Sequence, residues 1–519
     1  MNDANVDPLP APENLLDGAD MRVQESIHGH RFIQEQEPFM LVLETLAICA
    51  AKPLGTIPPG DTTHEAFHYE LPHRRKMRFL LFQDRHLEKV ASDETIHDQA
   101  KWEEWKSRVN DQYDPTRDGQ DHFSYLDHVF DRRIDALVQA VRLLRSMEVD
   151  VLHNRRWTSR FLAVTGPDMI CTDMREGPNR SWSGDRRFFG RGGELIYLML
   201  NRSSKAADVG KLIQKRLLNP DDPKNAIAKA LCDQVDQKAS STHIGYLPYR
   251  HNAAYDRLAD DWLAILNLDR LPNGHLFEPL FRITGLNLVV YLAERACTET
   301  GAKKVEPIVL DCTNGADKQL RQTSKEHLNR HRQAAHRAVQ DYVENRAAKD
   351  EGWRTAIEQN DRVGAARAIQ RLFGFRSNDT QLLSPDEQLK TLIQQAKTRD
   401  KNNIYKYLLP LVKNIGLATS RQRVGTWFGV DDAMIFALVM ANVTRTVELR
   451  EFVALLYDRY GLIIGPVEAR KAFERPPVGV QSFEANLAAF ESRMTRLSLT
   501  QRLSDDCAFV TNPYRNDHE

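Results

Sequence analysis

The sequence predicts a mainly α-helical, multidomain protein with a small α/β insert and a winged-helix-like C-terminal domain. Three observations predict this fold class. Apolar residues recur at three- and four-residue spacing along most of the chain. Short β-like runs broken by Gly-Pro and Ser-Gly follow Arg155. In about the last 90 residues, helical patterns are followed by two short runs that flank a turn.

The N-terminal part of the chain divides into a leader and a helical domain. Residues 1–20 are rich in Pro, Asn and Asp, so we expect a disordered leader. Residues 21–150 are expected to form a helical N-terminal domain. Its helices are predicted at Pro38–Ala51, His73–Val90, Asp98–Asn110 and His122–Met147.

Residues 151–315 are expected to form a mixed central domain that carries the insert. Short strands are predicted at Phe161–Val164 and Met169–Thr172, and a further strand at Glu306–Asp311, which ends in a turn. The helices of this domain are predicted at Glu194–Leu200, Val209–Leu218, Ala226–Val235, Asp256–Leu268 and Leu276–Ala296.

Residues 316–425 are expected to form a helical connector domain. Its first helix, Ala316–Ala347, has too thin an apolar stripe for a coiled coil, so we expect a solvated or inter-domain helix. The other helices are predicted at Glu351–Phe373, Pro385–Lys397 and Asn403–Ala418.

Residues 426–519 are expected to form the winged-helix-like domain. Asp431 and Asp432 are suited to cap an apolar helix, and a hairpin is predicted around Ser504. The order of elements resembles a winged helix; a plain helical subdomain with a terminal hairpin is the alternative. The helices are predicted at Ala433–Val443, Glu448–Tyr460, Pro466–Phe473 and Ser482–Leu497.

Composition excludes several classes of protein. The 519 residues carry 71 basic and 72 acidic side chains, a formal net charge of −1, and the mean hydropathy is −0.52. No apolar run approaches the roughly 20 residues that cross a bilayer, and the first residues lack the pattern of a secretory signal. We therefore expect a cytoplasmic protein without membrane contact. The six cysteines have no zinc-site spacing, and no cofactor is expected.

The near-neutral charge conceals a bias toward arginine. Of the 71 basic residues, 49 are Arg and 22 are Lys. Arginine binds phosphates and base edges bidentately and stacks on rings, whereas lysine is a hydrated point charge. A GC-rich genome would give the same bias toward arginine. Clustering of the arginines along the chain would instead favour a role in binding phosphates or bases. Nine arginines and no lysine lie between positions 155 and 202, beside Trp157 and Trp182.

This arginine-rich insert predicts contact with nucleic acid or another polyanion. Gly190, Gly192 and Gly193 precede the predicted helix at Glu194, and their amides would be open to an anion. In the alternative, the arginines pair with acids of the same region inside a large interface. The arginines assigned to nucleic acid here are Arg155, Arg156, Arg160, Arg180, Arg186, Arg187 and Arg191.

A second basic set belongs to the C-terminal part. Arg493 and Arg496 lie late on the last predicted helix and Arg502 lies on the hairpin, where a recognition helix and its wing would meet DNA. Arg421 and Arg423 form a further cluster upstream. Basic residues late in a helix also complement its dipole, which is the alternative explanation.

Two sets of residues would support an enzyme instead. Glu306, Asp311 and Lys318 surround the isolated strand and could form the Mg²⁺ site of a nuclease; a buried strand whose last acid caps the next helix is the alternative. His64 and His68 flank Glu65 in an HExxH pattern, in which the histidines would bind zinc and the glutamate would activate water. A short surface helix would give the same pattern. Walker and serine-hydrolase signatures are absent.

Three runs resemble proteins encoded in bacterial anti-phage defence islands. They are RRFFGRGGELIYLML, LREFVALLYDRYGLIIG and DCAFVTNPY. The runs are similar to those of uncharacterised, methylation-associated accessory proteins that occur beside DNA methyltransferases and ATPases. The resemblance implies a cytoplasmic accessory subunit that works on DNA together with partner subunits.

The function predicted from all of this is a non-catalytic DNA-binding or scaffold subunit of a prokaryotic defence complex. Its partners would be duplex DNA and the other subunits of that complex. The alternatives are a metal-dependent nuclease, a zinc hydrolase and a purely protein–protein scaffold. The oligomeric state and any enzymatic activity stay open at this point.

Overall fold

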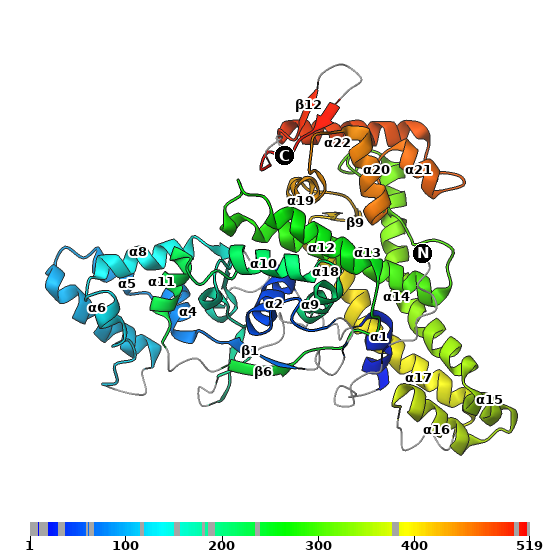
Figure 1. Ribbon diagram of the computed structural model, residues 1–519, viewed down its shortest axis with the longest axis horizontal. Coiled ribbons are helices and arrows are strands. Elements are labelled where there is room, and N and C mark those ends of the chain that lie inside the picture. Colours follow the sequence, from blue (N-terminus) through cyan, green and yellow to red (C-terminus); the bar gives the residue numbers. More distant parts are fainter. Residues whose placement is uncertain are drawn as a thin grey trace.

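The computed structural model describes residues 9, 19–29, 37–58, 61, 67–114, 119–149, 156–178, 182–184, 192–233, 239–375, 383–502 and 508–515. Helices dominate these residues and the strands are short, which confirms the mainly α-helical, multidomain class. Figure 1 shows a central helical body from which a lobe, an arm and a C-terminal unit extend.

The central body is built around one long apolar helix. This helix, α13 (Phe277–Thr300), is buried on nearly all sides and ends at Gly301, whose φ of 63° closes the helix. Among the described residues, the stretch Asn273–Thr300 is long and apolar enough to cross a membrane, but 83% of its apolar window is buried, as in a core helix. Against it pack α2 (Pro38–Ala51), α12 (Ala253–Leu266) and α18 (Lys406–Asn414). Two further helices, α9 (Gly192–Arg202) and α10 (Ala206–Arg216), pack in turn on α2 and α12.

The lobe contains the predicted N-terminal helices that follow Pro38–Ala51, with more breaks than expected. The predicted helix His122–Met147 is interrupted because Asp131 and Arg132 adopt left-handed φ values of 50° and 54°. Trp102 and Trp105 fill the core of the lobe. The helices are α4 (Arg75–Phe82), α5 (Leu87–Ala91), α6 (Asp98–Tyr113), α7 (Leu126–Val129), α8 (Ile134–Arg145) and α11 (Pro223–Leu231).

Three antiparallel two-stranded sheets connect the lobe to the body. The run Met169–Thr172 was expected to be a strand, but Met169 ends a 3₁₀ turn that begins at Pro167, and the next strand begins at Met174. The pairs are β1 (His68–Pro72) with β6 (Ala239–His243), β2 (Glu148–Val149) with β3 (Phe161–Leu162), and β4 (Met174–Glu176) with β5 (Trp182–Gly184).

The arm has a core of its own. Its longest helix, α14, begins beside α13 and runs outward, so the same helix belongs to the body and the arm. Val339 and Val343 of α14 pack there with Trp353 and Phe373. The arm helices are α1 (Ala19–His28), α14 (Lys318–Lys349), α15 (Glu351–Glu358), α16 (Arg362–Phe373) and α17 (Pro385–Asp400), and a π-helical turn at Lys401–Tyr405 leads on to α18.

The C-terminal unit combines helices with a small antiparallel sheet. Its strands lie in the order β10 (Val447–Glu448), β13 (Ala508–Val510), β12 (Thr500–Arg502). A short strand, β11 (Leu462–Ile463), leaves the unit and pairs in parallel with β7 (Ile308–Val309). The winged-helix fold stays a prediction. The helices of the unit are α19 (Asp432–Asn442), α20 (Leu449–Tyr460), α21 (Pro466–Ala472) and α22 (Val480–Arg496).

A buried polar network attaches the C-terminal unit to the body. Asp261 of α12 is fully buried and accepts hydrogen bonds from Arg459 at 2.6 Å and from the Tyr460 hydroxyl at 2.8 Å. One cluster of packed, buried apolar side chains also includes residues of both the body and the C-terminal unit, with members from Phe39 to Val510. The domain boundaries at 20, 150, 315 and 425 stay a prediction.

Candidate nucleic-acid interface

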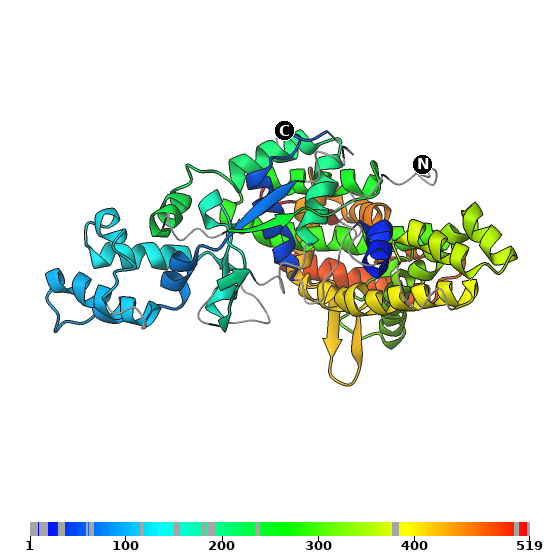
Figure 2. The same ribbon diagram turned by 90° about the horizontal axis from the view of Figure 1, so that it is seen from below.

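A two-stranded hairpin projects from the body beside the start of α14. It consists of β8 (Ala418–Arg421) and β9 (Gly425–Phe428) and is the golden pair of arrows below the body in Figure 2. At its tip, the Val424 amide donates to the Arg421 carbonyl at 3.1 Å, which closes a four-residue turn. Arg423 occupies the third position of this turn with φ 65°. That position favours Gly or Asn, so an arginine is held there at a conformational cost.

Asp311 fixes the base of the hairpin. This carboxylate is buried, and its oxygens accept hydrogen bonds from the Thr313 amide (2.9 Å) and hydroxyl (2.6 Å), the Gly315 amide (2.7 Å) and the Trp427 indole (2.9 Å). Its own amide donates to the carbonyl of Phe428. Asp311 therefore holds the end of β7, the turn that precedes α14, and strand β9 in one arrangement.

The first turns of α14 carry a row of cations. Asp317 caps the helix by accepting hydrogen bonds from the amides of Gln319 and Leu320 at 2.9 and 3.0 Å. Lys318, Arg321 and Lys325 follow at spacings of three and four, which places them on one face of the helix. Two of these three side chains reach the hairpin: the Arg321 guanidinium lies 5.9 Å from the centre of the Trp427 ring, and Lys325 donates to the Val424 carbonyl.

Three hydrogen bonds bring the hairpin cations and the α14 cations together. Arg421 donates to the carbonyl of Asn314 at 2.5 Å, and Arg321 donates to the neighbouring carbonyl of Gly315 at 3.0 Å. Lys325 donates to the carbonyl of Val424 at 3.0 Å. The acceptors are backbone oxygens, so these contacts position the cations without neutralising their charge.

We call the resulting patch the hairpin–α14 surface. In the part of the chain that the structure describes, none of its members forms an ion pair with a carboxylate. Its two nearest acids in the sequence are engaged elsewhere: Asp317 caps α14, and Glu326 accepts a hydrogen bond from Gln322. The members of the surface are Lys318, Arg321, Lys325, Arg421 and Arg423.

The C-terminal arginines predicted to meet DNA differ in availability. Arg493 pairs with Asp432, with 3.0 Å between Nε and Oδ1, and also binds the carbonyl of Val430, so it attaches α22 to the segment after β9. Arg502 lies 3.6 Å from Glu491. Arg496 is exposed and has no ion pair with any residue that the structure describes.

Two arginines of the predicted nucleic-acid set, Arg156 and Arg160, lie within the described residues, and both pair with acids of the chain. Arg160 binds Glu148 bidentately at 2.5 Å and stacks on Phe82, and Arg156 lies 3.5 Å from Asp173. For these two residues the geometry matches the ion-pair alternative. The other members of the predicted set lie outside the described residues: Arg155, Arg180, Arg186, Arg187 and Arg191.

Several buried arginines outside the predicted set stabilise the fold. Arg202, Arg216 and Arg295 are buried and donate to backbone carbonyls of distant segments, including those of Leu247 and Ile27. A guanidinium can satisfy several carbonyls at once because its donors form a fixed fork. Part of the excess of arginine over lysine therefore serves the fold.

The predicted anion site at Gly193, the second residue of α9, is already occupied. The Gly193 amide donates to Oε2 of Glu44 at 2.8 Å, and the chain packs so closely here that a Cβ on Gly193 would lie 2.5 Å from the Cβ of Glu44. The expectation of an accessible amide was wrong for Gly193, because the carboxylate of α2 is the anion at this helix end.

The residues of the nuclease hypothesis are not brought together. Glu306 and Asp311 lie at opposite ends of the segment around β7, roughly 16 Å apart along an extended chain, and Lys318 is exposed on α14. Burial would raise the pKa of Glu306, but His327, 2.6 Å away, holds that pKa below its usual value together with neighbouring positive charges. The described residues contain no group of three or more side chains suited to a metal ion.

Of the three residues of the zinc motif, the structure describes only the last, His68. His64 and Glu65 lie outside the described residues, whereas His68 is the first residue of strand β1. The motif needs both histidines on one helix, one turn apart. The expected helix therefore does not extend to His68.

Sequence reasoning found two members of the hairpin–α14 surface for this role and missed the rest. Arg421 and Arg423 were assigned to DNA, and Lys318 to a nuclease. Arg321 and Lys325 were not singled out, although their spacing with Lys318 was a visible signal. The hairpin itself was indicated only by β-branched residues on both sides of Arg421–Gly425.

Comparison with known proteins concerns mainly the C-terminal unit. Residues 439–514 match the model of a protein family. The family is described as methylation-associated defense system protein MAD7. This match confirms the resemblance to a defence-island accessory protein, and it covers two of the three runs that carried it, from Leu449 and from Asp506. No curated protein and no solved structure matches the chain.

The match supports a role in defence, with other components of such a system as partners. It spans α20 to β13, which is the unit that β11 and Arg493 attach to β7 and to the base of the hairpin. The matched segment and the hairpin–α14 surface are therefore parts of one connected structure.

Proposed function

We propose that this protein is a non-catalytic DNA-binding subunit of a prokaryotic anti-phage defence complex. The hairpin–α14 surface contacts the phosphates of duplex DNA, and the winged-helix-like C-terminal unit extends this contact through Arg496. The arginines of the insert that lie outside the described residues stay additional proposed contacts.

One observation carries the proposal. Cations from two elements separated by about a hundred residues gather around the turn at Asn314–Gly315 and the hairpin tip. Arg321, Lys325 and Arg421 are held there by carbonyls and not by carboxylates. An ion-pair scaffold would supply acids at such a place, as it does for Arg160. Guanidinium and ammonium groups that have no carboxylate partner are suited to bind phosphate oxygens.

The defence context rests on the family match, whose description links the family to methylation. Adenine N6, cytosine N4 and the C5 position of pyrimidines all lie in the major groove. A subunit that binds duplex DNA fits a system that must act on DNA according to such marks. The partner subunits would bind elsewhere on the chain.

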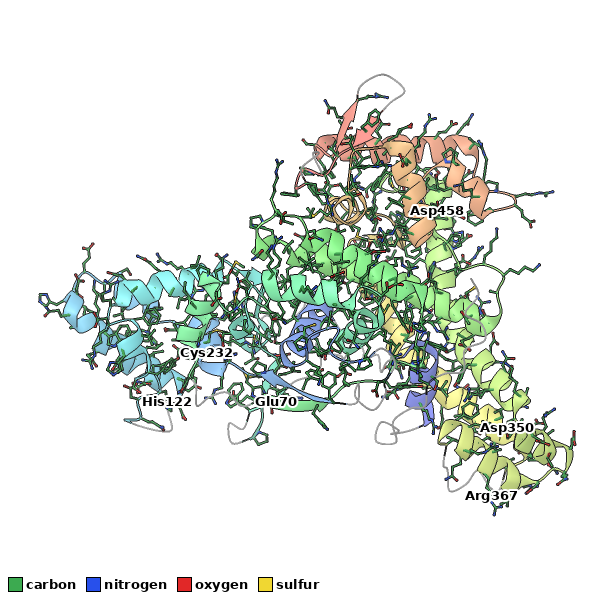
Figure 3. The ribbon with its side chains drawn as sticks, in the orientation of Figure 1. Glu70, His122, Cys232, Asp350, Arg367 and Asp458 are labelled. Atoms are coloured by element: carbon green, nitrogen blue, oxygen red, sulfur yellow. The ribbon has the colours of Figure 1, made fainter. Side chains whose placement is uncertain are left out.

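The experiment compares two double variants with equal loss of charge. Lys318→Glu with Arg423→Glu alters the hairpin–α14 surface; both side chains are exposed. Arg354→Glu with Arg367→Glu is the control on the arm, where Figure 3 labels Arg367 at the outer end. Binding of a fluorescent duplex is measured by anisotropy at low salt.

The surface variant is expected to bind at least tenfold more weakly than the unaltered protein, and the control within about threefold. Equal weakening of both variants would overturn the assignment of DNA to this surface. If the unaltered protein binds no duplex even at low salt, the DNA function fails. The protein–protein scaffold then takes its place, and co-purification with the neighbouring gene products tests it.

A further inference from the structure

We infer that duplex DNA continues from the hairpin–α14 surface along α18, where Lys401, Lys406 and Lys413 contact its phosphates. We call these three residues the α18 row. The inference rests on the proposed function and extends it, because the row adds a sequence-independent contact and lengthens the stretch of duplex that the protein covers.

The segment that leads into the hairpin carries charge of one sign. From Lys401 to Val430 the chain contains five basic residues and no acidic residue, although acids and bases are nearly equal in number over the whole chain. The acid just before this stretch, Asp400, is buried and pairs with His336 of α14 at 3.2 Å. A solvated helix face ordinarily carries charges of both signs. The exclusion of acids therefore points to an anionic partner.

A π-helical turn helps to align the lysines. Lys406 and Lys413 are seven residues apart, about two turns of α18, and so lie on one face of that helix. Lys401 is five residues before Lys406, a spacing that would place the two about 140° apart around an uninterrupted α-helix. The turn Lys401–Tyr405 is π-helical, and its wider turn brings Lys401 back toward the side of Lys406. Such turns occur frequently at functional sites.

The charges of the row are available to a partner. All three lysines are exposed, and none forms an ion pair with any residue that the structure describes. Lys406 donates to the amide oxygen of Asn402 at 3.0 Å, which leaves its charge in place. The aromatic side chain of α18, Tyr407, is buried, so this helix lacks the exposed ring on which a single strand stacks. Phosphates of a duplex fit the row better than unpaired bases do.

The row is continuous with the hairpin–α14 surface. At its outer end, the Arg332 guanidinium of α14 lies 4.1 Å from the centre of the Tyr405 ring, next to Lys406. Arg332 follows Lys325 by seven residues and so continues the cations on that face of α14. At its inner end, α18 is followed by the hairpin, and Figure 2 shows the yellow helices α17 and α18 leading to the hairpin base.

The length of the row corresponds to about five base pairs. Lys401 and Lys413 are twelve residues apart, about 18 Å along a helix axis, and the phosphates of one strand follow every 3.4 Å or so along a duplex. Lysine suits such contacts because it is a hydrated point charge that needs no planar partner. Three further phosphate contacts would steepen the slope of log affinity against log salt by about two to three.

The experiment measures binding as a function of duplex length. Fluorescent duplexes of random sequence, from about 8 to about 24 base pairs, are titrated with the full chain, and each affinity is corrected for the number of binding registers. The row variant carries Lys401→Gln, Lys406→Gln and Lys413→Gln. The control carries Lys349→Gln, Arg354→Gln and Arg367→Gln, which alter three exposed cations of the arm.

For the unaltered protein and the control, affinity is expected to rise with length until the duplex covers both the hairpin–α14 surface and the α18 row. For the row variant this rise should end about five base pairs earlier, and the salt slope on the longest duplex should be less steep by about two to three.

Three outcomes would overturn the inference. If the row variant keeps the length dependence and the salt slope of the unaltered protein, the α18 row does not contact DNA, while weaker binding by Lys318→Glu with Arg423→Glu still supports the proposed function. Loss of affinity by the same factor at every length overturns the extension along α18. Absence of binding to any duplex overturns both proposals.

Discussion

At the scale of single residues, Arg423 has a backbone conformation that suits glycine and a side chain that the proposed function assigns to DNA. Its φ of 65° suits glycine, and its guanidinium is exposed at the hairpin tip without an ion pair to any described residue. A residue selected only for the turn would be Gly or Asn. Arg74 and Arg132 also adopt a positive φ, and each pairs with an acid of the chain. For Arg423, the proposed function assigns this role to a phosphate of DNA.

Arg423→Gly is therefore expected to leave the thermal stability unchanged or to raise the free energy of unfolding by up to about 1 kcal/mol, because glycine adopts this φ without a steric cost. Duplex affinity is expected to fall, and the slope of log affinity against log salt to decrease by about one. Differential scanning fluorimetry and anisotropy measure the two effects. Unchanged affinity would assign Arg423 to the fold alone.

Asp311 is the opposite case, a polar residue whose function is structural. Its carboxylate oxygens accept four hydrogen bonds from Thr313, Gly315 and Trp427. Asp311→Ala is expected to lower the free energy of unfolding by about 3 kcal/mol or more, since buried donors lose their acceptor. Glu326→Ala, on the exposed face of α14, is the control and should cost less than about 0.5 kcal/mol.

Urea unfolding measures this difference, and a nuclease assay with Mg²⁺ accompanies it. A catalytic Asp311 would give the reverse result: a stable variant that loses a metal-dependent cleavage present in the unaltered protein. Because the hairpin base depends on Asp311, duplex affinity is expected to fall with stability in the structural case.

At the scale of elements, the close approach of α2 to α9 explains why α9 begins with two glycines. A Cβ on Gly193 would lie 2.5 Å from the Cβ of Glu44 and 2.8 Å from the Leu41 carbonyl oxygen and from the Thr45 nitrogen. Gly193→Ala is expected to lower the free energy of unfolding by about 2 kcal/mol or more through overpacking. Gly479→Ala, where nothing lies within 4 Å, should cost less than about 1 kcal/mol. Equal effects in urea unfolding would contradict this packing role.

A pH dependence is expected from α14. Burial lowers the pKa of His331 from 6.5 to about 4, against the smaller opposing effects of the Glu306 carboxylate and the Pro307 carbonyl, while His327 adds to the lowering. The unfolded chain therefore binds a proton at higher pH than the folded chain does. Stability from this group is complete above pH 6.5 and is lost as the pH falls from 6.5 toward 4.

Between pH 7 and pH 5, His331 is expected to account for about 2 kcal/mol of lost stability. Urea unfolding of the unaltered protein and of His331→Gln at both pH values measures this share. The variant should lose about 2 kcal/mol less than the unaltered protein on acidification. Parallel losses in both proteins would show that other groups cause the dependence.

Elements with strong local signals could be predicted from the sequence. Pro38–Ala51 was predicted with the bounds of α2 because a proline opens an apolar run there. The start of α14 followed from its periodicity and differs by two residues, since Asp317 caps the helix. The β8–β9 hairpin was not predicted, because its strands have four residues each and Asp311, which orders its base, lies 116 positions from Trp427.

The same reason limited prediction of the candidate site. Arg421 and Arg423 are neighbours in the sequence and were found together. Arg321 and Lys325 join them only through hydrogen bonds to the turn at Gly315 and to Val424, the latter 99 positions away. Contacts of that range leave no local pattern, so composition indicated a basic character without showing where the cations gather.

At the scale of the whole molecule, the net charge of −1 averages over unlike surfaces. Buried arginines such as Arg202 and Arg216 bind carbonyls, and Arg160 binds Glu148, so these charges are not available to a polyanion. The cations of the hairpin–α14 surface remain available. The bias toward arginine thus has a structural use in the interior, and the proposed function gives it a second use on the hairpin–α14 surface.

The dependence of duplex affinity on salt tests the central claim most directly. Five phosphate contacts predict a slope of log affinity against log salt of about −4 to −5, and removal of Lys318 and Arg423 together should make it less steep by about two. The Arg354 and Arg367 control should keep the slope of the unaltered protein. A flat dependence, or the same slope in both variants, would contradict binding of DNA phosphates by the hairpin–α14 surface.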